Sequence, residues 1–143
     1  MAIGRYARVN LDGKSCTKTK LSGAITLQAG HVVKLSSGTF IKHATDGKKQ
    51  GAIYIVNTNE SEGQQSGDTI AASSTIVGEI AETGRELAVL IKATQVLVED
   101  TPLTSAGDGT LRIAVIGTDE VIAYSQEALT VGAAAQLVKV RFA

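Results

Sequence analysis

Short apolar runs separated by turn signals constrain this chain more than any other feature of its sequence. From Gly84 to Ala143 the runs recur at intervals of roughly eight to twelve residues, and most are rich in Val, Ile and Leu. The run Glu86–Lys92 is bounded by charges, and Val138–Phe142 alternates apolar with basic residues, the period of a half-buried strand. Ser105–Thr110 contains two glycines that tolerate a left-handed backbone, so it is expected to be a turn. Thr110–Ile116 is expected to resume the strand pattern after this turn. The region is predicted to be β-structure from end to end.

The preceding part of the chain follows the same pattern. His31–Leu35 and Thr39–His43 are joined by two serines and a glycine, which predicts a β-hairpin. Gly51–Asn57 is apolar on both faces and is expected to be an inner strand. Thr75–Ile80 is also expected to be a strand. Residues 58–74 form a largely polar block, which predicts a long surface loop.

These patterns predict an all-β protein, a small sandwich or barrel of about nine short strands. The body is expected to span residues 24–143 as a single β-rich domain. The only helix candidates, Gln126–Val131 and Ala133–Ala135, are too short to be stable by themselves. The chain has no Trp and only five Phe and Tyr residues, so its core must be built from aliphatic side chains.

Residues 1–23 differ from the rest of the chain, because they are polar and show no sustained period of strand or helix. Residues 1–20 carry a net charge of +4, which leaves −4 on the remainder, since the formal charge of the chain is zero. We expect an extended basic arm that is loosely held in the free protein and becomes ordered on a partner. The alternatives are a terminus with no partner and an arm that folds back on its own body, which the opposite charges of the two parts permit. The candidate partner-binding residues are Arg5, Tyr6, Arg8, Lys14, Lys18 and Lys20.

Residues that could support catalysis or metal binding are sparse. His31 and His43 lack the spacing of a known zinc site and are expected at the surface. The single cysteine, Cys16, has no rigid base beside it in the arm and is expected to be a free thiol. No nucleophile elbow or phosphate-binding loop is present. The sequence therefore predicts a protein that is not an enzyme and that has no metal and no cofactor.

Composition narrows the possible partners and compartments. The balanced charge and the few aromatic residues argue against nucleic-acid binding. No apolar run of about 18 residues is present, so no membrane partner is expected. One cysteine allows no internal disulfide, which favours synthesis in a reducing cytoplasm.

Four stretches of the sequence form a recognisable order of turns and strands: LQAGHVVKLSSGTFIK (27–42), TPLTSAGDGTL (101–111), IAYSQEAL (122–129) and LVKVRF (137–142). This order resembles that of the small capsid decoration (cement) proteins of tailed bacteriophages. The resemblance covers roughly Ala24 to Phe142, and its motifs are turns and strands with no chemical site among them.

The resemblance implies a structural virion protein, made in the host cytoplasm, that binds the outer surface of an assembled phage head. There it would cement neighbouring major capsid subunits, and it would associate with itself as a trimer, or alternatively as a dimer. A β-sandwich binding module, for example one that recognises carbohydrate on a host surface, is the alternative. That function would need an exposed aromatic platform.

Overall fold

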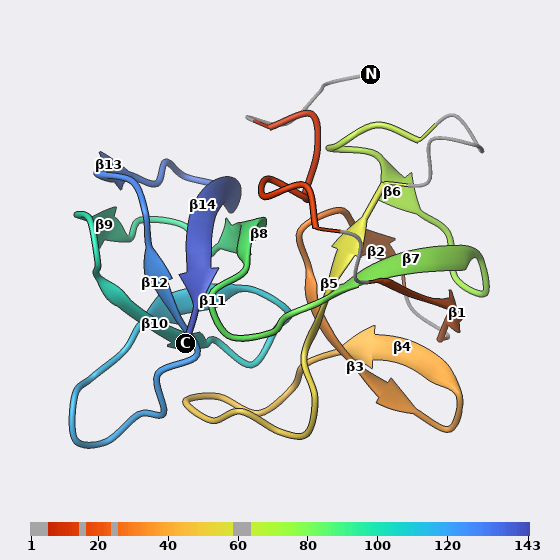
Figure 1. Ribbon diagram of the computed structural model, residues 1–143, viewed down its shortest axis with the longest axis horizontal. Coiled ribbons are helices and arrows are strands. Elements are labelled where there is room, and N and C mark those ends of the chain that lie inside the picture. The colour runs from red at the N-terminus through yellow and green to blue at the C-terminus, as the bar shows by residue number, and fades with distance from the viewer. Residues whose placement is uncertain (1–5, 15–16, 24–25, 59–63) are drawn as a thin grey trace.

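The computed structural model describes residues 6–14, 17–23, 26–58 and 64–143 (Figure 1). Every regular element in these residues is a β-strand, so the predicted all-β fold is confirmed. The strands number fourteen in the described part of the chain, more than the nine expected, because several last only two or three residues. No helix in the described residues is long and apolar enough to span a membrane.

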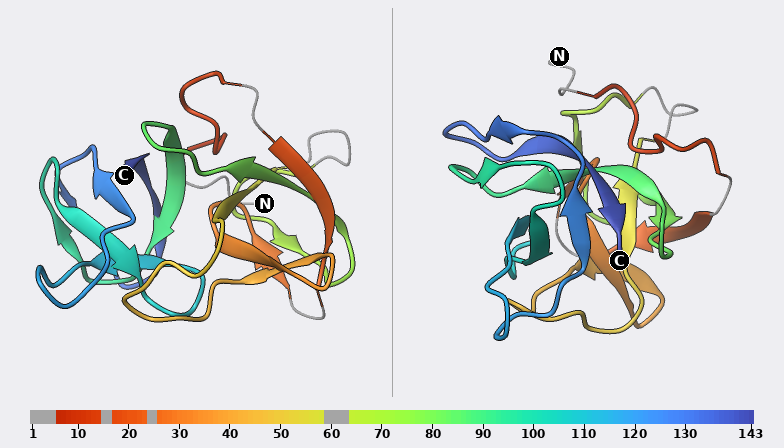
Figure 2. Two further views of the ribbon diagram at one scale, coloured as in Figure 1. Left: turned by 60° about the horizontal axis from the view of Figure 1, so that its bottom comes forward. Right: turned by 60° about the vertical axis from the view of Figure 1, so that its left-hand side comes forward.

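Ten of the strands form two five-stranded closed barrels that lie side by side (Figure 2). In the N-terminal barrel the hydrogen-bonded order is β1-β4-β3-β5-β7, and in the C-terminal barrel it is β10-β11-β8-β14-β12. Two two-stranded ribbons, β2-β6 and β9-β13, complete the fold. The strands are β1 (Thr17–Ser22), β2 (Leu27–Gln28), β3 (Val32–Ser36), β4 (Thr39–Lys42), β5 (Tyr54–Asn57), β6 (Thr69–Ile70), β7 (Thr75–Ile80), β8 (Glu86–Ile91), β9 (Val96–Leu97), β10 (Pro102–Ser105), β11 (Leu111–Ile113), β12 (Ala123–Ser125), β13 (Leu129–Thr130) and β14 (Gln136–Phe142).

The predicted hairpin is confirmed as β3 and β4, which pair from Val33↔Lys42 to Ser36↔Thr39. Ser37 and Gly38 form its two-residue loop, with φ angles of 50° and 80°. Positive φ at both loop residues is the geometry that matches the twist of an antiparallel pair. Serine departs from the usual Asn or Gly at the first of these positions.

The C-terminal strand prediction is also confirmed. β14 pairs with β8 over six residues and with β12 on its other edge, so this last strand is part of the wall of the C-terminal barrel. Val140 and Phe142 point into the core, whereas Arg141 is exposed. The alternation seen in the sequence therefore separates a buried face from a solvent face.

Two predictions of local structure are wrong in detail. The surface loop expected over residues 58–74 contains β6, and three residues in its described part are buried, Thr58, Ser66 and Ile70. Ile70 packs with the core of the N-terminal barrel, because it is the one large apolar side chain in that segment. The strand expected over Thr110–Ile116 ends at Ile113, after which the chain turns and exposes Val115 and Ile116.

The prediction of a loosely held arm over residues 1–23 is wrong for the residues that the structure describes. β1 pairs with β7 from Thr17↔Glu79 to Leu21↔Thr75 and so belongs to the N-terminal barrel. Residues 6–14, here called the N-terminal segment, cross the junction between the barrels, above it in Figure 1. Val9 within this segment is fully buried.

The N-terminal segment is ordered because β8 is apolar on both faces. Leu87, Val89 and Ile91 point into the C-terminal barrel, so Ala88 and Leu90 need a cover on the opposite face. Tyr6 and Leu11 pack against these residues and Leu137. The segment also bonds the edge of β8: Ala88 N–H donates to the Val9 carbonyl at 2.8 Å, and Leu11 N–H donates to the Glu86 carbonyl at 3.3 Å. The burial and these hydrogen bonds hold the segment in place.

One hydrophobic cluster connects the two barrels. The outer faces of β3 and β5 contribute Val32 and Ile55 to the same cluster of buried residues as Leu87 and Val89 of β8. Gly30 lies against β8, where its carbonyl accepts the Leu90 N–H at 2.9 Å. The shared cluster makes the packing of each barrel depend on the other.

Candidate partner-binding surface

The structure describes five of the six predicted partner-binding residues and spreads these five over both barrels. Arg5 lies outside the described residues. The half-buried Tyr6 donates its hydroxyl hydrogen to Glu127 Oε1 at 2.5 Å, which ties it to the C-terminal barrel. Arg8 and Lys14 are exposed on the N-terminal segment, whereas Lys18 and Lys20 are exposed on β1 of the N-terminal barrel. Only the last two lie on one face of one element.

Lys18 and Lys20 share a face because they are two residues apart in a strand. Their partners across the ladder are Gly78 and Ile76 of β7. Directly opposed residues point to the same side of a sheet, so both lysines flank the side of β7 that carries the buried Ile76. They remain exposed because nothing covers this end of β1 among the described residues.

Among the described residues, no strand pairs with the edge of β1 opposite β7 over Thr17–Lys20. β4 pairs with β1 only at Leu21 and Ser22, in parallel register, and beyond that point β4 has turned back into β3. In an antiparallel ladder alternate residues direct both backbone groups away from their partner strand. Two of the four residues Thr17–Lys20 therefore direct their N–H and C=O groups to an edge that no described strand covers, beside the ammonium groups of Lys18 and Lys20.

Neither Lys18 nor Lys20 forms an ion pair within the described part of the chain. By contrast, Arg112 is held by Asp46 and Asp119, and Lys139 faces Glu86 at 3.4 Å. The open strand end thus combines hydrogen-bonding capacity with an unneutralised charge, features that suit an acidic extended segment of a partner.

Sequence reasoning missed a buried polar network that positions the start of β1. Its centre is the fully buried Arg85, which donates to Asp12 and, through Nη2, to Glu79 Oε1 at 3.0 Å. Glu79 also accepts from the side-chain amides of Asn10 and Asn57, each at 3.1 Å. The network links the N-terminal segment to β5, β7 and β8.

The network fixes Lys14, three residues before β1. The Lys14 carbonyl accepts from Asn10 Nδ2 at 2.7 Å and from Arg85 Nη2 at 3.1 Å. Asp12 accepts the Lys14 and Glu86 N–H groups, each at 2.9 Å. Burial acts to raise the pKa of Asp12, but the hydrogen bonds from Arg85 and the two backbone groups lower it to about 2.

A sequence signal for this network did exist. Glu79 is a charged residue within the otherwise apolar strand Thr75–Ile80, and Arg85 directly precedes the apolar run of β8. Buried charges require partners, so two opposite charges at interior positions predict a pair. The sequence alone did not identify Asp12 as the third member.

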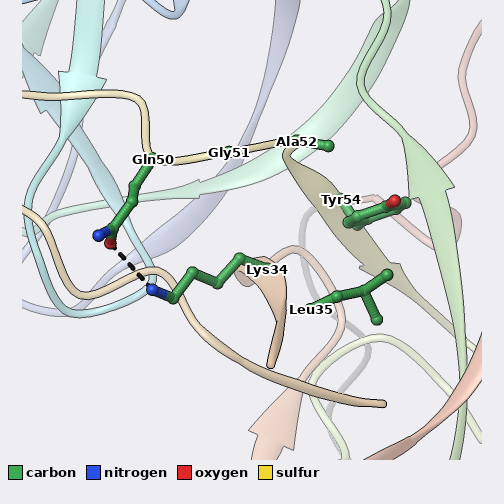
Figure 3. Close-up of a pocket in the computed structure, with 6 residues that line it drawn as sticks. All are labelled: Lys34, Leu35, Gln50, Gly51, Ala52 and Tyr54. Carbon is green, nitrogen blue, oxygen red and sulfur yellow. Dashed lines mark hydrogen bonds between the residues drawn. The ribbon is translucent and has the colours of Figure 1, made fainter. Parts of the chain in front are cut away.

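A shallow pocket of about 310 Å³ lies where β3 ends beside the start of β5. Leu35, Ala52 and the Tyr54 ring give it an apolar lining. On the opposite side, Lys34 Nζ donates to Gln50 Oε1 at 2.9 Å (Figure 3). Gln50 Oε1 also accepts from the Thr45 hydroxyl at 2.7 Å, so the loop that carries Gln50 is held to itself as well as to β3.

The expectation of two surface histidines is wrong. His43 is fully buried and His31 is half-buried, and both lie between the two barrels. Within the described residues no group of three or more His, Cys, Asp or Glu side chains could hold a metal ion. Cys16 lies outside the described residues.

Comparison with known proteins adds no relative. No family model matches the chain, and a search of curated proteins found no significant match.

Proposed function

We propose that this chain is a structural virion protein that binds the outer surface of an assembled phage head and cements neighbouring major capsid subunits. The resemblance of residues 24–142 to phage decoration proteins supports this assignment. The single structural observation that carries it is the open, basic end of β1. Thr17–Lys20 offer backbone hydrogen bonds and the ammonium groups of Lys18 and Lys20 to a partner surface.

The physical argument rests on rigidity. The Arg85 network and the cover of β8 hold the N-terminal segment in a fixed position, and pairing with β7 holds β1, so little conformational entropy is lost when a partner binds. Repetition over a shell converts a modest affinity at each site into stabilisation of the whole assembly, because the bound protein favours the assembled state by mass action. Self-association as a trimer, or alternatively a dimer, is part of the same proposal.

The alternative, a module for carbohydrate or host-surface recognition, lacks its main requirement. All five aromatic residues are described: Phe40, Tyr54 and Phe142 are buried, and Tyr6 and Tyr124 are half-buried. No ring is therefore presented as an exposed stacking platform. Screening the protein on a glycan array is a direct test of this alternative.

The proposal is tested with heads that lack the protein. Purified protein is added to such heads, the heads are separated by sedimentation, and the bound copies are counted. We expect saturable binding in a fixed ratio to major capsid subunits and a higher temperature of head disruption. Absence of binding to heads, with a signal on glycans instead, would favour the alternative.

A further inference from the structure

His43 presents a ring lone pair to a backbone N–H at the contact between the barrels. The ring follows β4 and is fully buried, and its Nε2 accepts the Gln50 N–H at 2.9 Å. Its Nδ1 lies 2.9 Å from Ser105 Oγ at the end of β10. A nitrogen that accepts an N–H carries no proton, so the neutral ring bears its hydrogen on Nδ1 and donates it to Ser105.

The ring of His31 also accepts a hydrogen bond from a backbone N–H group. Its Nδ1 accepts the Gln28 N–H at 2.9 Å. The ring lies beside Gly109, where an added Cβ atom would stand 3.2 Å from His31 Cδ2. Both rings therefore border the same structure of the C-terminal barrel, the turn formed by Ser105–Thr110, here called the 105–110 turn.

The 105–110 turn docks on the N-terminal barrel through backbone hydrogen bonds that flank the two rings. Gly47 N–H donates to the Ser105 carbonyl and Val32 N–H donates to the Gly109 carbonyl, each at 2.8 Å. Gly107 lies against Asp46, since a Cβ atom added there would stand 3.3 Å from Asp46 Cβ. The rings and these contacts form one continuous interface.

Burial and the charged groups around the two histidine rings disfavour protonation of either ring. Burial and then Lys34 lower the pKa of His43, and burial and then Lys42 lower the pKa of His31 to about 4, against the attraction of Asp108. The carboxylates are already engaged. Asp46 is paired with Arg112 at 2.9 Å, and Asp108 accepts the backbone N–H and the hydroxyl of Thr110 and faces Lys92.

We propose that the contact between the 105–110 turn and the N-terminal barrel is a conformational switch that acid opens, with His31 and His43 as the proton acceptors. A proton on Nε2 of His43 would face the Gln50 N–H, and a proton on Nδ1 of His31 would face the Gln28 N–H. Two donors cannot form a hydrogen bond, so each protonated ring must leave its position. Release of His43 also frees Gln50, which holds Lys34 at the rim of the pocket (Figure 3). The switch therefore couples the barrel contact to the shape of that pocket.

Amide hydrogen exchange followed by NMR between pH 7 and pH 5 tests the proposal. We expect the opening equilibrium of the amides of Gln28, Gly47 and Gln50 to rise about tenfold per pH unit for each histidine released, below about pH 6.5. Amides of β8 and β14 should keep their protection over this range. If both groups of amides lose protection together, the histidines act only on global stability and the switch is wrong.

Two substitutions test whether the histidines themselves cause the pH dependence. His31→Asn and His43→Gln place an amide oxygen near the accepting nitrogen of each ring and cannot titrate, so the double variant should lose the pH dependence at Gly47 and Gln50. Retention of the wild-type pH dependence would overturn the proposal. If the double variant does not fold, titration of the two rings in the wild-type protein decides: ring protonation while the 105–110 turn stays protected would also overturn it.

Discussion

Arg85 holds Asp12 with two hydrogen bonds, Nε to Oδ2 at 3.3 Å and Nη2 to Oδ1 at 3.1 Å, and the guanidinium group is 0% exposed. Asp12 lies in the N-terminal segment and Arg85 directly precedes β8. This pair therefore joins the N-terminal segment to β8 of the C-terminal barrel. Because Arg85 is buried, its charge depends on the carboxylates of Asp12 and Glu79.

Asp12→Ala should lower the free energy of unfolding by about 3 kcal/mol, because it leaves part of a buried charge uncompensated. Urea denaturation followed by circular dichroism measures the change. Asp46→Ala is the matched control, since Asp46 pairs with Arg112 but its side chain is 64% exposed. Exposed pairs contribute about 1 kcal/mol or less. Equal losses in the two variants would contradict the role given to the Asp12 pair.

Stability should fall in acid through Asp12. The folded-state pKa of about 2 lies below the ordinary value of 3.8, so the contribution is complete above about pH 4 and is lost as the pH falls towards 2. Urea midpoints from pH 5 to pH 2 should therefore decline less steeply in Asp12→Ala than in the wild-type protein. Parallel declines would show that Asp12 titrates normally in the folded state.

Much of the C-terminal half could be predicted from its sequence, because local patterns decide it. Val138, Val140 and Phe142 alternate with basic residues, and this period alone specifies a strand with one buried face. Gly107 and Gly109 have φ angles of 81° and 86°, so the turn between β10 and β11 also follows from residue type. The division into two barrels could not be predicted, since it depends on pairing between distant strands.

The N-terminal segment was misjudged for a physical reason that can be identified. Its own composition is too polar to form a core, and composition was the basis of the prediction. The order comes from the other side of the contact, because Ala88 and Leu90 on β8 leave an apolar face that needs a cover. A strand that is apolar on both faces, such as residues 87–91, was the available signal. Deletion of residues 2–20 is consequently expected to destabilise the fold.

Val9→Ala should cost about 2 kcal/mol of stability, because Val9 is fully buried and its methyl groups would leave a cavity. Val98→Ala removes the same atoms from a side chain that is 61% exposed, so it should change stability by less than about 0.5 kcal/mol. Thermal denaturation of the two variants makes the comparison. Similar melting temperatures would mean that the N-terminal segment is not packed on the body in solution.

Gly30→Ala should destabilise the junction between the barrels more than Gly38→Ala destabilises the hairpin loop. Both glycines have positive φ, 95° and 80°, so alanine is strained at each by about 1–2 kcal/mol. At Gly30 the added Cβ would also stand 2.3 Å from Leu137 Cδ2, whereas at Gly38 it meets nothing within 4 Å. Overpacking adds about 1–3 kcal/mol. Equal losses would show that the junction relaxes around the methyl group.

The central claim is that the open basic end of β1 binds the head, and charge reversal on this strand tests it most directly. The affinity of Lys18→Glu/Lys20→Glu for heads that lack the protein is compared with that of Lys48→Glu/Lys49→Glu. The second pair makes the same charge change on exposed lysines of the connection between β4 and β5. We expect the β1 variant to bind at least about tenfold more weakly, a loss of about 1.4 kcal/mol, and the control to bind like the wild-type protein. Wild-type affinity in the β1 variant would contradict the account.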